Sequence, residues 1–530
     1  MVRRIFLYSV LFVLVFNLAI SFVFPPIWWS MVFFGPLFLI GFCDMLQNRR
    51  AILKNFPVIG NLRYLMELIR PEINQYFVES NSEGRPFSRE DRSVVYQRAK
   101  NELDTIPFGT QKDIYQGGYE WVNHTIVPKA VDPSNMRVTV GGPQCGQPYS
   151  ASILNIGAMS FGALSKNAVM ALNEGAKLDN FAHNTGEGGL SPYHLKGGGD
   201  LIWQIGTGYF GCRTASGGFD PDQFKEKSRL PKVKMIELKL SQGAKPGGGG
   251  ILPGAKVTKE IAQARGVPVG KTVNSPLTHS TFDTPVGLMR FIARLRELTD
   301  GKPVGFKLCI GKRHEFLALC KAMVQTGITP DFIAVDGSEG GTGAAPLEFS
   351  NYIGYPLTEG LIFVQNALVG FSLREKIKLF ASGKVTSGFG MVRRLSMGAD
   401  VIYSARGMML AMGCIQALKC NTNHCPVGIT THDPGLVVGL VVTDKRQRIA
   451  SFHRNTIKSL SQIIGAMGLS HPSELKPWHL MRRLDVTRVT HYAHIYQFLN
   501  TGDLLKDPLP ESFAEAYRAA SAENFSRAGH

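Results

Sequence analysis

The feature that most constrains the fold is an alternation, from Pro107 onward, of strand-like apolar runs and helical patterns. Almost every apolar run ends in glycine or polar residues. The runs are ASILNIGAMS (151–160), FAHNTGEGG (181–189), MIELKLSQG (235–243), KTVNSP (271–276), PVGFKLCIG (303–311), DFIAVDGSEGG (331–341), IKLFASGKV (377–385) and DVIYSARG (400–407). Such alternation predicts an α/β fold with a parallel sheet, and eight strands predict closure into a TIM (β/α)8 barrel with its catalytic face at the strand ends.

The main alternative is an open doubly wound sheet, whose dinucleotide-binding form needs G-x-G-x-x-G after its first strand. The chain has one match, GTGYFG at 206–211, and we see no clear strand before it. A motif outside its structural context is weak evidence, so we do not interpret this one as a nucleotide signature. Helical patterns separate the barrel runs at 166–176, 284–299, 315–326 and 388–397.

Two uncharged apolar runs, 5–24 and 27–43, begin the chain and are separated by Pro25 and Pro26. A membrane span needs about twenty apolar residues, and the first run reaches that length. Basic residues flank the pair on both sides, at Arg3, Arg4, Arg49, Arg50 and Lys54. The positive-inside rule then predicts a transmembrane helical hairpin in the inner (cytoplasmic) membrane, with both ends and the catalytic domain in the cytoplasm.

A signal peptide is one alternative for this segment, but no small-residue cleavage site is visible and a second apolar run follows at once. A hydrophobic hairpin for oligomerisation is another. We therefore predict four parts: a transmembrane hairpin (1–50), a helical connector (51–106), the barrel (107–440) and a short, basic, helical C-terminal extension (441–530).

The charge balance is strongly basic, with 58 Lys and Arg against 41 Asp and Glu, a net charge of +17. Such an excess suits nucleic acid, anionic lipid or acidic substrates. No nucleic-acid motif accompanies it, so we expect a membrane and an acidic substrate and no nucleic acid.

Three of the eight cysteines, Cys414, Cys420 and Cys425, form a C-x5-C-x4-C run followed by Pro426 within the loop 413–433. Soft thiolates at short spacing can converge on one metal centre, which requires a reducing compartment. The gaps are longer than those of a zinc site. An iron–sulfur cluster with three protein ligands fits the spacing better, and a set of buried free thiols is the simpler alternative.

Five separated segments resemble the flavin domain of the glutamate synthase large subunit, in the same order. They are MSFGALS (159–165), GEGG (186–189), ELKLSQGAKPGGGGILPG (237–254), GGTGAAP (340–346) and the cysteine loop. Agreement of several motifs in order is far more specific than any one of them. The resemblance covers roughly residues 107–432 and implies an oxidoreductase acting on CH–NH2 donors, with FMN and a three-iron, four-sulfur (3Fe-4S) cluster held by the three cysteines.

The reaction implied is the reductive amination of 2-oxoglutarate, through 2-iminoglutarate, to L-glutamate, with electrons passing from the cluster to FMN. The residues expected at FMN are Met159, Ser160, Lys307, Gly340, Gly341, Ser382, Gly383, Lys384, Ala405, Arg406 and Gly407. The last six lie in loops after the predicted strands seven and eight, where barrel enzymes often bind phosphate through backbone N–H groups.

Two lysines, Lys239 and Lys245, lie six residues apart across a strand end and the glycine-rich loop after it. Two ammonium groups suit a dicarboxylate. By the resemblance, Arg265, Gln242 and Glu187 complete the substrate site, and Lys307 and Glu187 act in catalysis.

The glycine-rich loop departs from the family pattern at two positions, because Gly248 and Ile251 replace a glutamate and a glutamine. The segment 337–341 reads GSEGG in place of GHDGG. These departures leave two alternatives open: a related flavin enzyme acting on another amine or 2-oxo acid, such as an N-methylglutamate synthase, or a membrane-tethered electron-transfer subunit.

We see no amidotransferase domain before the barrel and no NAD(P)-binding domain. We therefore expect ammonia from solution or from an ammonia-donating subunit, and a separate electron donor, either ferredoxin or a reductase subunit. Homo-oligomerisation is left open.

Overall fold

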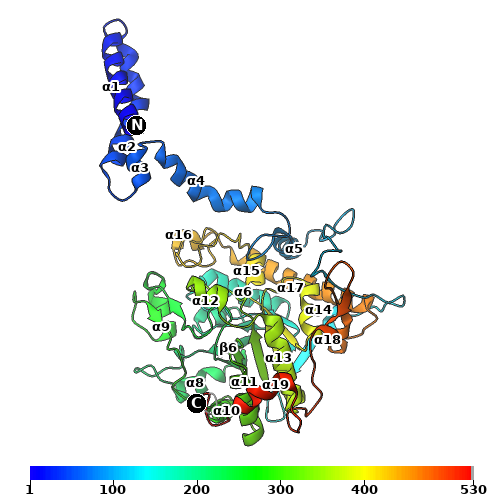
Figure 1. Ribbon diagram of the computed structural model, residues 1–530. Helices are drawn as coiled ribbons and strands as arrows, with labels where there is room; N and C mark the ends of the chain where they lie inside the picture. The colour runs from blue at the N-terminus through cyan, green and yellow to red at the C-terminus, as the bar shows by residue number, and fades with distance from the viewer. Residues whose placement is uncertain (527–530) are drawn as a thin grey trace. The chain divides into compact units, whose positions relative to one another are not determined.

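The computed structural model describes residues 1–526, and the chain divides into two compact units, Met1–Arg89 and the part from Glu90 onward (Figure 1). We describe each unit by itself.

The first unit is helical throughout. Its elements are α1 (Val2–Ser21), the 3-10 turn η1 (Pro25–Ser30), α2 (Met31–Leu46), α3 (Ala51–Asn55), α4 (Gly60–Ile73) and the π-helical turn η2 (Asn74–Val78). Val2–Ser21 and Pro25–Leu46 are long and apolar enough to cross a membrane by length and composition alone. The prediction of two apolar N-terminal helices is confirmed, and their insertion into a membrane stays a prediction.

A closed barrel of eight parallel strands forms the centre of the second unit, as predicted. Around the barrel the strands are β4 (Leu154–Ile156), β5 (His183–Asn184), β6 (Leu201–Ile205), β7 (Val233–Lys239), β10 (Val304–Leu308), β11 (Phe332–Asp336), β12 (Lys378–Ser382) and β13 (Val401–Ser404). The last strand pairs with the first through Ile402 and Leu154, which closes the barrel.

One predicted barrel strand is wrong. The run 271–276 supplies only Val273–Asn274 (β9), which pairs antiparallel with β8 (Ile251–Leu252) outside the barrel. The third barrel strand is instead β6, five fully buried residues that follow a glycine cluster. The segment GTGYFG (206–211) therefore does follow a strand directly, contrary to our interpretation of the sequence.

The predicted helices around the barrel are confirmed, with ends set by local capping. In α6 (Lys166–Leu178) the Oγ of Ser165 accepts a hydrogen bond from the N–H of Ala168, and in α10 (Pro285–Leu298) Thr284 does the same for Gly287. Such caps satisfy N–H groups that the first turn leaves without partners. The other two predicted helices are α11 (Arg313–Thr326) and α14 (Gly388–Ser396).

An antiparallel hairpin of β2 (Arg137–Val140) and β3 (Tyr149–Ser152) packs against the barrel core. Its Val140 and Ala151 belong to one buried cluster with side chains of six barrel strands or their flanks. The cluster members from the barrel are Ala182, Ile202, Met235, Phe332, Ala334, Phe380, Val401 and Tyr403.

A buried polar layer lies inside the barrel around the carboxylate of Glu237 on β7. Its Oε1 accepts hydrogen bonds from Asn184 on β5 (2.9 Å) and Gln204 on β6 (2.6 Å), and its Oε2 accepts one from Tyr403 on β13 (2.9 Å). Three donors compensate a carboxylate that is removed completely from water.

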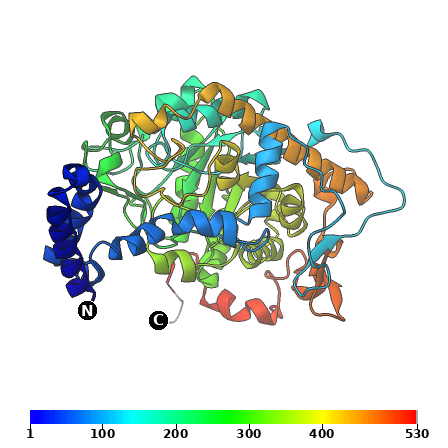
Figure 2. The ribbon, with the colours of Figure 1, turned by 90° about the horizontal axis from the view of Figure 1, so that it is seen from above.

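The C-terminal part is both helical and stranded. The long helix α17 (Val442–Ala466) packs against α6 and α14 (Figure 2). Gly175 of α6 permits the close approach, because a Cβ there would lie 2.6 Å from the side chain of Ile449. Farther on, β14 (Leu480–Arg483) pairs with β15 (Val489–His491) and with β1 (Glu120–Val122) before the barrel, and α19 (Glu511–Ala519) follows.

Candidate functional site

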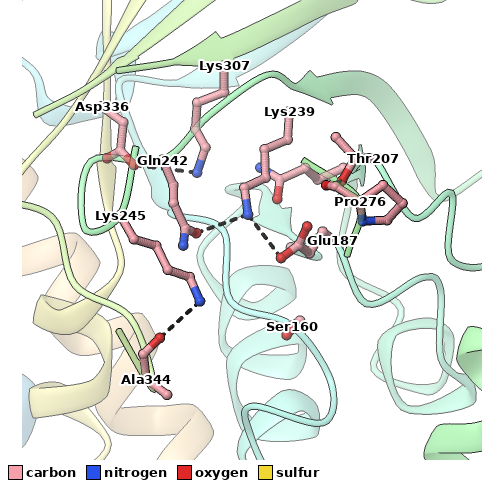
Figure 3. A network of polar contacts seen from close by, with 12 residues as sticks. Ser160, Glu187, Thr207, Lys239, Gln242, Lys245, Pro276, Lys307, Asp336 and Ala344 are labelled. Carbon is pink, nitrogen blue, oxygen red and sulfur yellow. Dashed lines mark hydrogen bonds and ion pairs between the residues drawn. The ribbon is translucent and has the colours of Figure 1, made fainter. Parts of the chain in front are cut away.

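Charged side chains gather where the barrel strands end (Figure 3). Lys239 is the last residue of β7, Lys307 lies near the end of β10, and Asp336 is the last residue of β11. Glu187 comes from the loop after β5. Because parallel strands present their carboxyl ends on one face of a barrel, residues distant in sequence meet at its mouth.

The ammonium group of Lys239 is the centre of this network. Its Nζ lies 3.0 Å from Oε1 of Glu187 and donates to Oε1 of Gln242, also at 3.0 Å. The structure therefore brings together three of the residues predicted to bind substrate.

Glu187 is held in the ionised form. Its burial opposes ionisation, but Lys239, Arg265 and Lys245 outweigh it and lower the pKa of the carboxyl group. Burial lowers the pKa of the Lys239 ammonium, against the attraction of Glu187. The carboxylate has room because residues 206 and 250 are glycines. A Cβ at either position would lie within 2.5 Å of a Glu187 oxygen.

Two further contacts join the loops after β7 and β11. The Nζ of Lys245, a residue only 3% exposed, donates to the carbonyl oxygen of Ala344 at 3.0 Å. Asp336 accepts a hydrogen bond from the N–H of Gly243 at 2.9 Å and lies 3.7 Å from Nζ of Lys307. Gly243 is required here, because a Cβ at this position would lie 1.7 Å from the carbonyl oxygen of Gly337.

Arg265, at the end of α9 (Lys259–Arg265), connects the substrate residues to the loop after β4. Its guanidinium donates to the carbonyl oxygen of Phe161 (3.1 Å) and to Oγ of Ser160 (3.3 Å). Burial lowers the pKa of Arg265 to about 10, so the side chain remains a cation at neutral pH. Arg265, which we predict to bind the substrate, is thus in direct contact with Ser160, which we predict to bind FMN.

His279, which we did not predict, contacts the backbone of Lys239. Nε2 of His279 lies 2.9 Å from the carbonyl oxygen of Lys239, and Nδ1 lies 3.1 Å from the hydroxyl of Tyr209. Because a carbonyl oxygen only accepts, Nε2 carries the proton. Burial lowers the pKa of His279 to about 4, so the ring is neutral at physiological pH.

The loops after β11, β12 and β13 meet around Arg406. Its guanidinium donates to the carbonyl oxygen of Glu339 at 2.5 Å. It also lies close to Gly341, because a Cβ at that position would be 2.6 Å from Nε of Arg406. A Cβ at Gly383 would lie 3.2 Å from the Glu339 carboxylate. Three of the residues predicted for FMN therefore belong to one region in which a half-buried cation adjoins glycine backbone, which suits a phosphate-bearing ligand.

The remaining predicted FMN residues lie on the same strand-end loops. Met159 and Ser160 follow β4, and Gly186 packs against their backbone. Ser382 ends β12, Lys384 has a left-handed backbone with φ of 45°, and Ala405 precedes α15 (Arg406–Ala411). Gly340 lies in the loop after β11, and Gly407 is the second residue of α15, after β13. Whether these residues bind FMN stays a prediction.

In the cysteine loop, Cys425 has the surroundings of a thiolate. Its burial opposes ionisation, but the nearby hydroxyl of Thr430 and the N–H groups of Thr430, Val427 and Ile429 lower the pKa of the thiol. Burial raises the pKa of the Cys414 thiol to about 11. Within residues 1–526, no three His, Cys, Asp or Glu side chains converge closely enough for a single metal ion. Whether the three cysteines hold an iron–sulfur cluster stays a prediction.

Several hydrogen bonds connect the cysteine loop to the loops at the mouth of the barrel. His432 lies 2.7 Å from the carbonyl oxygen of Gly162, and the N–H of Ser165 donates to the carbonyl oxygen of Ile429 at 2.8 Å. The buried ammonium of Lys256 donates to the carbonyl oxygens of Cys420 (2.8 Å) and Thr430 (2.7 Å). The loop after β4 therefore contacts Arg265 on one side and the cysteine loop on the other.

Sequence reasoning missed Asp336, His279 and Lys256. The position of Asp336 at a strand end, directly before Gly337, could have indicated a role. No local pattern marks His279 or Lys256, because their partners lie 40 to 174 residues away in the chain.

Comparison with known proteins agrees with this architecture. Residues 145–470 match the family model described as a conserved region in glutamate synthase. The glutamate synthase large subunit-like protein YerD of Bacillus subtilis (strain 168) is 36% identical over 499 residues, which cover 86% of this chain and 94% of that protein. The archaeal-type glutamate synthase (NADPH) of Thermotoga neapolitana is 32% identical over 320 residues. That match spans 60% of each protein, so the chain corresponds to only part of this relative.

A closed parallel barrel with buried cations at its mouth defines a barrel enzyme, and its relatives place it among the oxidoreductases. The chain belongs to the glutamate synthase family.

Proposed function

We propose that the protein catalyses the reductive amination of 2-oxoglutarate, through 2-iminoglutarate, to L-glutamate. The observation that carries this proposal is the charge at the barrel mouth. Lys239, Lys245 and Arg265 are three buried cations near one ionised carboxylate, Glu187, which leaves a net charge of +2. A dicarboxylate supplies two negative charges, and buried cations without such partners are costly.

The protein's own residues bind and orient the acid. Lys245, on the glycine-rich loop, and Arg265, on α9, are the cations proposed to bind the acid beside Glu187. Lys239 is oriented by Glu187 and Gln242, and its backbone is supported by neutral His279. The ionised Glu187 accepts hydrogen bonds and thereby favours a cationic amine or iminium group beside it.

The cofactors we propose are FMN and a 3Fe-4S cluster, as the family resemblance implies. When bound, FMN would supply the two-electron reduction of the imine, and the cluster would deliver electrons to it one at a time. The glycine loops with Arg406 are proposed to hold the flavin phosphate, and Lys307, beside Asp336, to face the flavin ring. Cys414, Cys420 and Cys425 are the proposed cluster ligands.

The proposed partners are a separate electron donor, either ferredoxin or a reductase subunit, and ammonia from solution or from an ammonia-donating subunit. We further propose that α1 and α2 anchor the protein in the cytoplasmic membrane with the barrel in the cytoplasm. Alkaline carbonate extraction of membranes tests the anchor: the full-length protein should stay in the pellet, and release into the supernatant would contradict it.

Reoxidation of the reduced flavin tests the reaction. Protein purified anaerobically in detergent is photoreduced, and 2-oxoglutarate with ammonia is then added while the flavin absorbance is followed. We expect reoxidation and formation of L-glutamate only when both reactants are present. No reoxidation would contradict the synthase proposal and favour an electron-transfer subunit.

A second candidate reaction is the same reduction with another amine or 2-oxo acid, such as N-methylglutamate formation. It is favoured by Gly248 and Ile251, which give the loop an apolar residue, 47% exposed, and no carboxylate where the family pattern has polar residues. Faster reoxidation with methylamine than with ammonia would select this alternative.

A further inference from the structure

Helix α4 carries an apolar stripe that continues into η2. The stripe residues are Ile59, Leu62, Met66, Ile69, Ile73 and Tyr76, at alternating spacings of three and four. Such spacing places side chains on one face of a helix. Each of these six residues is between 36% and 66% exposed. An exposed apolar face of this length is unusual for a protein surrounded only by water.

Basic side chains border the stripe. Arg63 and Arg70 each follow a stripe residue by one position and are seven residues apart, so they lie along the same edge of the helix. On α4 itself Glu67 and Glu72 balance these two arginines, and Arg63 lies 3.1 Å from Glu67 in an exposed ion pair; the net charge of +3 over 47–78 comes from the basic residues 49, 50 and 54 just before the helix. An apolar face with a cationic border is typical of helices that lie in the interface of an anionic membrane.

The start of α4 is fixed to the end of α2. The carboxylate of Asp44, a buried residue in the last turn of α2, accepts hydrogen bonds from the N–H of Val58 (2.9 Å) and from Nδ2 of Asn61 (2.6 Å). Gly60 packs against Leu53 of α3, since a Cβ there would lie 3.1 Å from Cδ2 of that leucine. Whatever surface the end of α2 reaches, the first turn of α4 reaches it too.

We propose that α4 is an interfacial helix that binds the cytoplasmic surface of an anionic phospholipid bilayer through this stripe. The inference rests on the membrane placement proposed above and extends it beyond the two apolar helices. The headgroup phosphates pair with Arg63 and Arg70 while the stripe enters the boundary of the acyl chains. The heptad-like spacing also suits a second copy of the helix, but the cationic border and the link to α2 favour lipid.

The test places a fluorescent amino acid at one position of the full-length protein by stop-codon suppression. Met66 reports from the stripe, and Tyr64, on the opposite side, is the matched control. Each variant is reconstituted into vesicles of phosphatidylcholine and phosphatidylglycerol that contain nitroxide-labelled lipid. We expect severalfold stronger quenching at position 66 than at position 64, and a smaller difference when phosphatidylglycerol is omitted or when Arg63 and Arg70 are both replaced by Gln.

Three results would overturn the inference. Equal quenching at both positions in protein that floats with the vesicles refutes the interfacial helix and leaves the anchor intact. Weak quenching at position 66 that strengthens as lipid is added in excess over protein indicates a second copy on the stripe. Failure of the protein to float with vesicles refutes the membrane placement itself.

Discussion

Replacing Lys245 with Met removes one buried ammonium group and keeps the length of the side chain. In the structure its Nζ donates to the carbonyl oxygen of Ala344 at 3.0 Å and is one of the cations that keep Glu187 ionised. The direct contact of Glu187 with Lys239 is independent of Lys245, so the centre of the network should persist.

The expected loss follows from the contact that a substrate carboxylate would make. A hydrogen bond to a charged group contributes about 1.5–3 kcal/mol. Since about 1.4 kcal/mol corresponds to a factor of ten in binding, the apparent KM for 2-oxoglutarate should rise roughly ten- to a hundredfold. Flavin content and visible spectrum should stay near those of the unmodified protein.

The assay is the rate of flavin reoxidation at varied 2-oxoglutarate and saturating ammonia. Lys271→Met, at an exposed lysine beyond the same glycine-rich segment, is the control and should leave KM unchanged. Lys245→Arg should restore part of the binding because it restores the charge. An unchanged KM in Lys245→Met would refute the dicarboxylate reasoning, whereas loss of flavin would mean that Lys245 serves the cofactor.

Three further predictions concern the cluster, the backbone and the pH dependence of stability. Cys420→Ser should lower the iron content and the paramagnetic signal of the oxidised cluster, because a hydroxyl is a poor ligand for iron in place of a thiolate; unchanged iron would contradict the cluster assignment. Gly243→Ala should sharply lower the yield of folded protein, because its Cβ would overlap a carbonyl oxygen, whereas Gly343→Ala, with open space around it, should not. The pKa of His279 is lowered to about 4 from its usual value near 6.5, so between these pH values only the unfolded chain gains the proton and the free energy of unfolding falls with falling pH. This amounts to about 1.4 kcal/mol per pH unit, and His279→Gln should remove that slope from the thermal unfolding midpoints measured across the window; an unchanged slope would contradict it.

The barrel could be predicted from the sequence because seven of its strands carry long apolar runs that end in glycine or polar residues. The third strand, β6, was missed because its apolar run, LIWQI at 201–205, is short and only six residues separate the glycine cluster from GTGYFG. The segment 271–276 has the composition of a strand, but its pairing partner is the short β8, and pairing is not visible in composition.

In the candidate site, too, sequence patterns predict only the residues that lie in recognisable motifs. Lys239, Gln242 and Glu187 could be grouped in advance because motifs mark them, and the structure places them in contact. Lys256 and His279 act through backbone carbonyls of residues far along the chain, and such contacts leave no local signal. The terminal extension was expected to be helical, and its strands were missed because β1, their partner, precedes the barrel.

Two neighbouring positions on β7 contribute to different properties: Glu237 to the hydrogen bonds inside the barrel, and Lys239 to the candidate site at its mouth. Glu237 and Lys239 are two residues apart on β7, so both point into the barrel, one above the other. The lower carboxylate ties together β5, β6, β7 and β13, while the upper ammonium contacts Gln242 and Glu187 on the strand-end loops. Substitutions on those loops, such as Gly248 and Ile251, can therefore alter the choice of substrate without disturbing barrel closure. Specificity and barrel closure thus depend on different residues of one strand and its following loops, so the two properties can change separately.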